Sequence, residues 1–533
     1  MQILVLINGQ QNGPYSPEEV RQYLASGQLQ PQMQAWREGM KDWQPLETFP
    51  EFAAVAASTG RGAKRSRAGL YASLALGAVA LCAVAGWWVW HGKRSSGSAA
   101  ATAEGTATAA TTSTVGGPKW PKTLAELNQW YAQPPPGQNA AEFFLQGCDA
   151  MKEQMQTHAY DKNVNLPVIG KPSIPEPDSP VPGAMETAIA EFMQENQPAW
   201  DLFERGSSMT QSRYPIDMTK GSETQLPHLA RLKQAAQLSQ VFALGYADTG
   251  RGKEAGESLF IGYAIGQSVE AEPILISQLV RVACDAITFA ALGQIANRVA
   301  VPPETLTRLQ EVLGGMADRE AGGENFNRAF VGEKLIGLSH FDITPKELQQ
   351  FLASNSGGSP GDDKDGIMAG LRQDGLKNVK ADRRFFADSC DQYLAARKEP
   401  FPARLKADDM IKQRYAEAVK KRFWMSAMVL NSGGLTVREA RGLALLRLAQ
   451  TAVGLERFRA ASGKGYPDDL AELTPKFLAS VPQDPFDGQP LRYAKSGNGY
   501  SLNSIGPAGA APNLLKALMI TVSNPPKSGS AGP

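Results

Sequence analysis

The stretch Gly69–Trp90 reads GLYASLALGAVALCAVAGWWVW and decides the organisation of the whole chain. Its 22 residues carry no charge, and a helix of this length crosses a hydrocarbon core of about 30 Å at 1.5 Å per residue. Trp87, Trp88 and Trp90 gather at one end, where amphipathic rings favour the membrane interface. We therefore predict that residues 69–90 form a single transmembrane helix.

The charges on either side of this stretch predict its orientation. Four basic residues precede it and two follow it: Arg61, Lys64, Arg65 and Arg67 before, Lys93 and Arg94 after. Because basic flanks stay on the cytoplasmic side, residues 1–68 are expected in the cytoplasm and the residues after Trp90 outside it. Two alternatives remain open: a buried helix of a soluble core, or a long signal peptide cleaved near Ser98–Ala103.

Composition and linkers divide the rest of the chain. The 533 residues are 42% apolar and carry 54 basic against 53 acidic residues, which argues against disorder and against a nucleic-acid partner. Residues 53–68 are predicted to form a basic juxtamembrane linker. Residues 91–117, rich in Ala, Thr and Ser, are predicted to form a flexible linker, because such side chains bury too little surface to offset their ordering entropy.

The first 52 residues carry the signals of a small α+β domain. The apolar run Ile3–Ile7 is followed by an Asn-Gly turn pair. Ser16 and Pro17 are typical of a helix start, and Gly27 is typical of a helix end. We expect a β-hairpin, a helix and a second β-hairpin.

The spacing of these residues and of the segment Trp36–Trp43 resembles that of GYF domains, most closely the bacterial GYF-like variant. Such domains bind proline-rich peptides in an aromatic groove, because a polyproline II helix is already ordered and stacks on rings. The resemblance implies a peptide-binding site formed by Gly13, Pro14, Tyr15, Tyr23, Trp36 and Trp43.

The chain departs from the GYF pattern where binding matters. Ile3-Leu4-Val5 stands where the family has an aromatic strand, and Gln28-Leu29 follows Gly27 in place of Tyr-Phe. An alternative is that the aromatic rings form the core of the domain, because a domain of this size needs large apolar side chains. These rings are those of Tyr15, Tyr23, Trp36 and Trp43.

The region 118–430 is predicted to be mostly α-helical. Thr123 and Asn139 are expected to cap two short helices. From residue 226 onward, Ala-rich apolar helices follow one another as antiparallel hairpins, similar to tetratricopeptide-type stacks. Since no 34-residue period is present, we predict helical pairs and not true repeats.

Residues 431–510 combine a long helix with a tail rich in Gly, Pro and Asp. This pattern resembles the C-terminal domain of type II secretion pseudopilins, and residues 118–510 resemble large bacterial extracytoplasmic proteins whose role is not assigned. The resemblance implies a small β-meander. No carboxylate stands in Ala508–Ala511, where major pseudopilins hold calcium, so we expect no metal there, with Asp484 and Asp487 capping turns. Residues 511–533 are expected to be disordered.

The search for catalytic patterns gives only weak candidates. HExxH, GxSxG and Walker A motifs are absent from the sequence. The densest polar group is Arg213–Asp217 together with Glu223 and His228. Its Asp217, Glu223 and His228 suit acid–base work, or the group can lock a loop against a helix start. We expect no cofactor. Cys82 falls in the predicted membrane helix, and at most one disulfide can form among the outer cysteines Cys148, Cys284 and Cys390.

The sequence thus predicts a multidomain, single-pass protein of the bacterial inner membrane. A small α+β GYF-like domain faces the cytoplasm, and a mostly α-helical domain ending in a β-meander faces the periplasm. The expected partners are the membrane, a proline-rich peptide inside and a protein outside. Two alternatives are an extracytoplasmic enzyme and an accessory subunit of a secretion apparatus.

Overall fold

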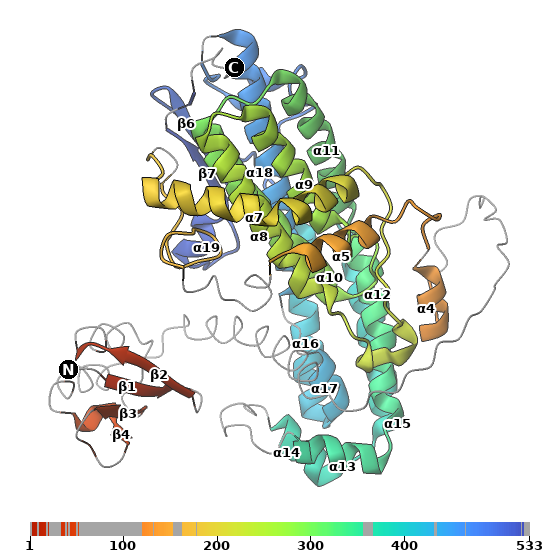
Figure 1. Cartoon of the computed structure of the whole chain (residues 1–533). Helices are drawn as coiled ribbons and strands as arrows, with labels where there is room; N and C mark the ends of the chain where they lie inside the picture. Colours follow the sequence, from red (N-terminus) through yellow and green to blue (C-terminus); the bar gives the residue numbers. More distant parts are fainter. Residues whose placement is uncertain are drawn as a thin grey trace. The chain divides into compact units, whose positions relative to one another are not determined.

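The computed structural model describes residues 3–7, 10–17, 20, 33–37, 40, 43–49, 52, 120–131, 133–152, 163–176, 179–354, 366–430, 434–463, 465–523 and 525–526. They fall into two compact units, Met1–Leu76 and Gly77–Pro533 (Figure 1). The predicted transmembrane helix 69–90 and the linkers 53–68 and 91–117 lie outside the described residues.

The N-terminal unit is built on a four-stranded antiparallel sheet. Its strand order is β2-β1-β3-β4. The strands are β1 (Ile3–Ile7), β2 (Gln10–Tyr15), β3 (Gln34–Arg37) and β4 (Gln44–Pro45), followed by a 3-10 turn, η1 (Leu46–Thr48). The described core of this unit consists of Ile3, Val20, Ala35, Leu46, Phe49 and Phe52.

A bulge in the edge strand β2 accommodates the Gly-Pro pair. Ile3 pairs with Tyr15 and Val5 with Asn12, so Gly13 and Pro14 together oppose one residue of β1. Proline has no N–H to give to a ladder and is therefore confined to edges and bulges of sheets. The pair fits this strand because β2 is at the edge and the bulge interrupts its pairing.

The second unit is mostly helical, as predicted. Its described helices are α4 (Leu124–Trp130), α5 (Ala140–Ala150), α7 (Gly183–Ser207), α8 (His228–Asp248), α9 (Gly252–Gln267), α10 (Leu275–Arg298), α11 (Pro303–Gly322), α12 (Glu324–Ser339), α13 (Pro345–Ser354), α14 (Ile367–Asp374), α15 (Val379–Ala396), α16 (Lys406–Lys421), α17 (Trp424–Leu430), α18 (Leu435–Ser462) and α19 (Pro512–Lys516). Short 3-10 turns join several of them: η3 (Met218–Glu223), η4 (His340–Asp342), η5 (Ala403–Leu405) and η6 (Leu470–Leu473).

Two of the predicted helix starts are confirmed by their capping bonds. The Thr123 side chain accepts from the N–H of Glu126 at the start of α4, and Asn139 accepts from the N–H of Ala141 at the start of α5. Each bond satisfies a donor that the first turn of a helix leaves without an intrahelical partner.

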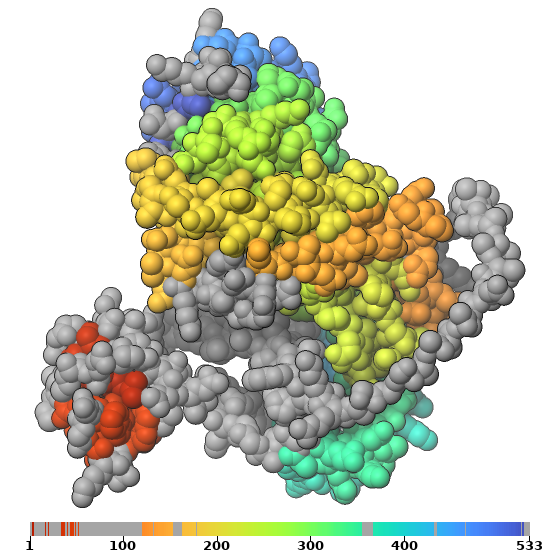
Figure 2. Space-filling model, in the orientation of Figure 1, coloured from red at the N-terminus to blue at the C-terminus, as the bar shows by residue number. Residues whose placement is uncertain are grey.

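Helices α8, α9, α10, α11 and α18 run alongside one another as a bundle (Figure 1). Helix α7 packs against α8 and α9 and runs across one face of this unit, where it is yellow in Figure 2. The α8–α9 and α9–α10 neighbours are the antiparallel pairs expected from the sequence. Their Ala and Gly residues allow this close approach; a Cβ at Gly262 of α9, for example, would stand 2.6 Å from the Thr288 hydroxyl of α10.

Two apolar cores share this unit. The larger core joins α4–α11, α18 and the C-terminal sheet, and the smaller core joins α12–α17. Helices α10 and α18 enter both: Leu275 and Leu435 lie in the smaller core, and Phe289 and Leu446 in the larger one. These two helices therefore connect the two halves of the unit.

Helix α10 is the one described helix that is long and apolar enough to cross a membrane. In the structure 61% of its most apolar window is buried by neighbouring helices. It also carries Arg281 and Asp285, both of which are about 1% exposed. These features are those of the central helix of a folded core.

A three-stranded antiparallel sheet closes the chain, in the order β5-β6-β7. Its strands are β5 (Arg492–Ser496), β6 (Gly499–Asn503) and β7 (Met519–Val522). The expected small β-rich end is therefore present, but the prediction that residues 511–533 are disordered is wrong for residues 512–522. Ile520 and Val522 are buried against the larger core, and Asn297 of α10 bonds the backbone of Thr521 and Ser523, which orders the segment.

Residues 406–430 form two helices, α16 and α17, and not one. Arg422 has a positive φ of 58°, a conformation that ends α16. The Asp382 carboxylate then accepts from the N–H groups of Met425 and Ser426 at the start of α17. This long-range cap comes from α15 and stabilises a new helix start where the apolar periodicity alone shows none.

Candidate functional site

The outer face of the N-terminal sheet presents an apolar pair. Leu4 of β1 and Trp36 of β3 are directly opposite in the antiparallel register, and both are half-buried. Their neighbours Ile3 and Ala35 are fully buried, so the alternation of the strands turns Leu4 and Trp36 away from the core. Side chains directly opposite on one face lie close enough to act as one surface.

Trp43 extends this row by its place in the register. Gln34 pairs with Pro45 and Ala35 with Gln44, so Trp43 stands at the position that would continue the ladder opposite Trp36. Trp43 is also half-buried. The Trp36 indole N–H donates to the Met40 carbonyl at 2.9 Å, which fixes one edge of the ring and leaves its faces for packing. We refer to Leu4, Trp36 and Trp43 as the outer apolar row.

The structure distributes the six predicted site residues over two regions. Strand β2 contains Gly13, Pro14 and Tyr15, whereas Tyr23 lies outside the described residues. Trp36 and Trp43 belong to the opposite half of the sheet, and neither is part of the described core. Leu4 was not predicted; the signal for it is its place next to Ile3, because successive side chains of a strand point to opposite faces of the sheet.

The three polar residues considered for acid–base work do not form one site. The exposed Asp217 caps η3, where its carboxylate accepts from the N–H of Thr219 at 3.0 Å. Glu223 is exposed, whereas His228 is only 2% exposed and lies 2.8 Å from Glu272. The alternative of an enzyme built on Asp217, Glu223 and His228 therefore has no geometric support.

His228 belongs instead to a buried polar cluster at the start of α8. Its ring stacks on Tyr214 at 4.2 Å between centroids, and the Tyr131 hydroxyl lies 3.4 Å from Glu272. Burial, followed by the charge of Glu272, raises the pKa of Tyr131 well above its ordinary value. The cluster thus ties the start of α8 to the α9–α10 loop and to the end of α4.

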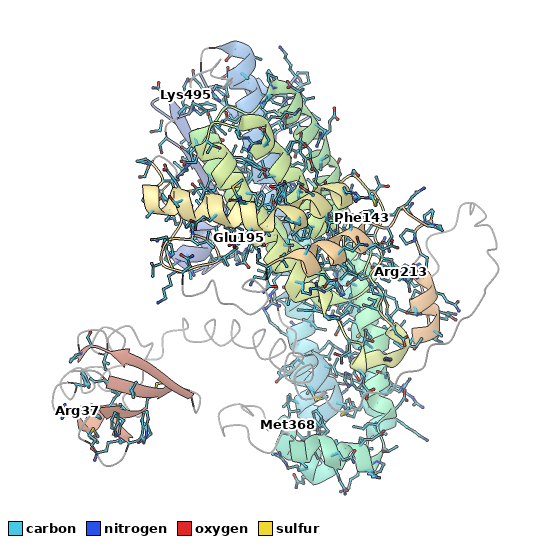
Figure 3. All side chains as sticks on the ribbon, viewed as in Figure 1. Arg37, Phe143, Glu195, Arg213, Met368 and Lys495 are labelled. Atoms are coloured by element: carbon cyan, nitrogen blue, oxygen red, sulfur yellow. The ribbon has the colours of Figure 1, made fainter. Side chains whose placement is uncertain are left out.

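Arg213 packs on the Tyr131 ring of this cluster. Its guanidinium lies 4.6 Å from the centre of the Tyr131 ring and bonds the Asn128 carbonyl, and Figure 3 labels it beside α4. The pKa of Arg213 is lowered by burial. These contacts hold a loop against a helix, which was the second possibility weighed for these residues.

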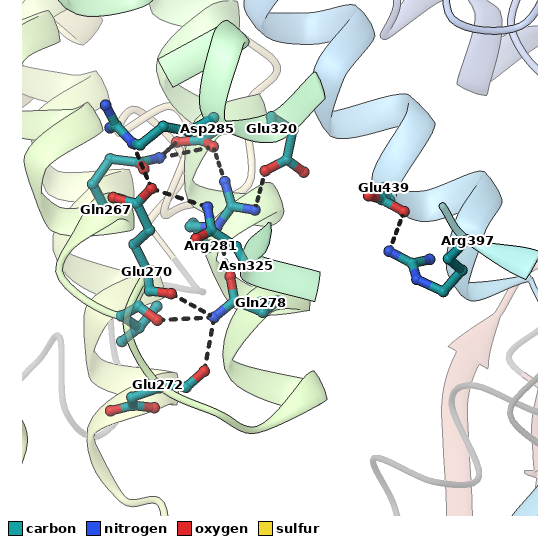
Figure 4. A network of polar contacts seen from close by, with 12 residues as sticks. Gln267, Glu270, Glu272, Gln278, Arg281, Asp285, Glu320, Asn325, Arg397 and Glu439 are labelled. Carbon is teal, nitrogen blue, oxygen red and sulfur yellow. Dashed lines mark hydrogen bonds and ion pairs between the residues drawn. The ribbon is translucent and has the colours of Figure 1, made fainter. Parts of the chain in front are cut away.

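A second buried group, the ion-pair layer, lies where the two cores of the helical unit meet. Five charged residues, each at most 4% exposed, form it: Arg281 (α10), Glu320 (α11), Arg397 (α15), Arg404 (η5) and Glu439 (α18). Figure 4 shows the Arg281–Glu320 and Arg397–Glu439 pairs. Charges buried at this depth persist only when they are paired.

The geometry of the layer satisfies this requirement. Arg281 bonds Glu320 at 2.6 Å, and Glu439 receives Arg397 at 2.7 Å and Arg404 at 2.9 Å. Burial alone would lower the pKa of Arg397, but the Glu439 carboxylate raises it above its ordinary value. These paired contacts fix how α10, α11, α15 and α18 meet.

Neither buried group has the composition of a metal centre. Within the residues that the structure describes, no three His, Cys, Asp or Glu side chains converge as metal ligands. Two aspartates of the C-terminal tail, Asp484 and Asp487, were predicted to cap turns. Their carboxylates accept from the N–H groups of Phe486 and Gln489, which confirms both caps.

Comparison with known proteins identifies the N-terminal unit. Residues 4–52 match the family model described as GYF domain 2, so this part of the chain is a GYF-type domain. GYF domains are interaction modules of the peptide-binding type. No curated protein and no solved structure matches the chain.

Proposed function

We propose that this protein is a single-pass membrane scaffold whose cytoplasmic GYF domain binds a proline-rich segment of a partner. The family match over residues 4–52 carries the proposal, because GYF domains bind such peptides. The outer apolar row supports it, because the half-buried rings of Trp36 and Trp43 suit the ordered surface of a polyproline II helix.

Peptide binding is tested with the full chain in lipid nanodiscs and a fluorescent decaproline peptide. Trp36→Ala removes the central ring of the row and is expected to weaken binding by at least about tenfold, as for an aromatic anchor. Trp120→Ala is the matched control, because Trp120 is a 40% exposed tryptophan in the helical unit. Equal affinities for the parent and Trp36→Ala would refute the site.

The topology in this proposal rests on residues 69–90 and on the basic flank before them. With the N-terminus inside, the helical unit is placed in the periplasm, where the linker 91–117 gives it reach to a second partner. Alkaline phosphatase fused after residue 533 should be active, since this reporter folds only outside the cytoplasm. An inactive fusion together with a fluorescent C-terminal GFP would contradict the orientation.

The outer partner distinguishes two versions of this proposal. The pseudopilin-like pattern of residues 431–510 favours an accessory subunit of a secretion apparatus, whereas the helical pairs of 118–430 favour a general scaffold. Cross-linking in intact cells followed by purification of the full chain separates them: recovery of secretion components supports the former, and recovery of other periplasmic proteins the latter.

A further inference from the structure

A cleft of about 320 Å³ lies between the first half of α7 and the C-terminal end of α8. Its size is at the lower end of the range for small-molecule sites, and it is too small for a folded partner. The lining residues come from these two helices and from the turn into α9.

The floor of the cleft is apolar. Ile189 is 3% exposed, and Met193 is half-buried beside it. A Cβ at Gly245 would stand 2.4 Å from the Met193 sulfur and 2.8 Å from the Ile189 Cγ2, so these two side chains lie directly on the α8 backbone and form the floor. A ligand on this floor is therefore expected to offer an aliphatic surface.

Two carboxyl groups stand at one side of this floor. Asp248 is half-buried and Glu186 is exposed across from it on α7. Burial, then the charge of Glu186 and a hydrogen bond with it, raises the pKa of Asp248, while Arg298 of α10 acts in the opposite direction. Arg298 is itself held by the carbonyls of Glu176 and Ser179. Two neighbouring carboxyl groups at the edge of an apolar cleft favour a cation beside them.

The helix end adds negative potential at the same place. Helix α8 has no basic residue in its last turn, although the carbonyl end of a helix favours cations. The nearest lining cation, Arg251, bonds Glu254 at 2.8 Å and lies 4.5 Å from the Tyr246 ring centre. Its charge is thus offset by its own partner.

We propose that this cleft binds a small aliphatic amine, with the ammonium group between Glu186 and Asp248 and the alkyl chain on Ile189 and Met193. The ligand class follows from three features together: paired carboxyl groups, a last turn of α8 that carries no basic residue, and an apolar floor of limited volume. The site is independent of peptide binding by the N-terminal domain.

The test uses the full chain in nanodiscs and ligand-observed saturation-transfer NMR with 1-aminopentane. The amine should show saturation transfer at millimolar concentration, and the isosteric 1-pentanol and pentanoate should show at least about tenfold less affinity. Asp248→Asn and Glu186→Gln should each weaken amine binding by about tenfold. Glu191→Gln is the matched control, because Glu191 is an exposed carboxylate of α7 outside the cleft lining.

Three outcomes overturn the proposal. Absence of transfer to 1-aminopentane, equal binding of 1-pentanol, or equal losses in Glu191→Gln and Asp248→Asn would each do so. Binding of the peptide acetyl-Ala-Lys-Ala-amide without binding of 1-aminopentane would assign the cleft to a protein partner instead. Circular dichroism melting of each variant separates lost binding from lost folding. Because Glu186 is exposed, Glu186→Gln keeps the test informative if Asp248→Asn unfolds the protein.

Discussion

Replacing Glu439 with Gln tests whether the ion-pair layer holds the two helical cores together. The change keeps the shape of the side chain but removes the negative charge that faces Arg397 at 2.7 Å and Arg404 at 2.9 Å. All three side chains are at most 4% exposed, so water cannot replace the lost partner. Breaking a buried ion pair from one side costs about 3–5 kcal/mol.

This cost converts into a measurable shift of the melting temperature. For a helical unit of about 400 residues, an unfolding entropy of ~2.1 cal/mol/K per residue makes 3–5 kcal/mol equal to about 4–6 °C. Differential scanning calorimetry of the full chain in nanodiscs gives the value directly. The control is Glu417→Gln, which breaks exposed pairs with Arg414 and Lys421 and should leave the melting temperature unchanged. A Glu439→Gln shift no larger than that of the control would refute the reasoning.

Further predictions concern buried single residues. Burial raises the pKa of Asp285 to about 7, so the folded state holds a proton that the unfolded state releases above pH 4, and stability falls as the pH rises from about 4 to 7. The Asp285→Asn variant should lose this dependence on pH. Its free energy of unfolding, measured with urea, should exceed that of the parent by an amount that grows to about 4 kcal/mol across that window. A difference between the two proteins that does not change with pH would contradict the prediction. A Cβ at Gly332 would lie 1.7 Å from a carbonyl oxygen of the α9–α10 loop. Gly332→Ala should therefore lower the free energy of unfolding by about 1–3 kcal/mol or more. The control Gly315→Ala should be neutral or stabilising, because the nearest atom to its Cβ would be 3.4 Å away. In a Cys82→Ser background, maleimide should label the native protein only after unfolding, because burial raises the pKa of the three free thiols Cys148, Cys284 and Cys390; rapid native labelling would show that they are accessible.

Local chemistry made much of the fold predictable. The caps at Thr123 and Asn139 and the turn at Asp484 follow from side chains that bond N–H groups two or three residues along the chain. The helical class of residues 120–462 follows from apolar spacing, because each helix has to bury one face. The GYF-type domain was recognisable because its Gly, Pro and aromatic residues occur at fixed intervals.

The parts that the sequence did not predict all depend on pairing over long distances. Strand β7 forms at residues 519–522 because β6 and Asn297 supply partners from elsewhere in the chain. The break before α17 depends on Asp382, more than 40 residues upstream.

Sequence by itself therefore determined the local elements, the composition of each segment and the identity of the N-terminal module. Tertiary structure alone decided three contacts: Leu4 lies opposite Trp36 on the sheet, His228 lies beside Glu272, and Glu439 pairs with two arginines. The physical reason is one of range. Capping and periodicity act within a few residues of the chain, whereas a buried charge is stable only beside a partner that folding brings to it.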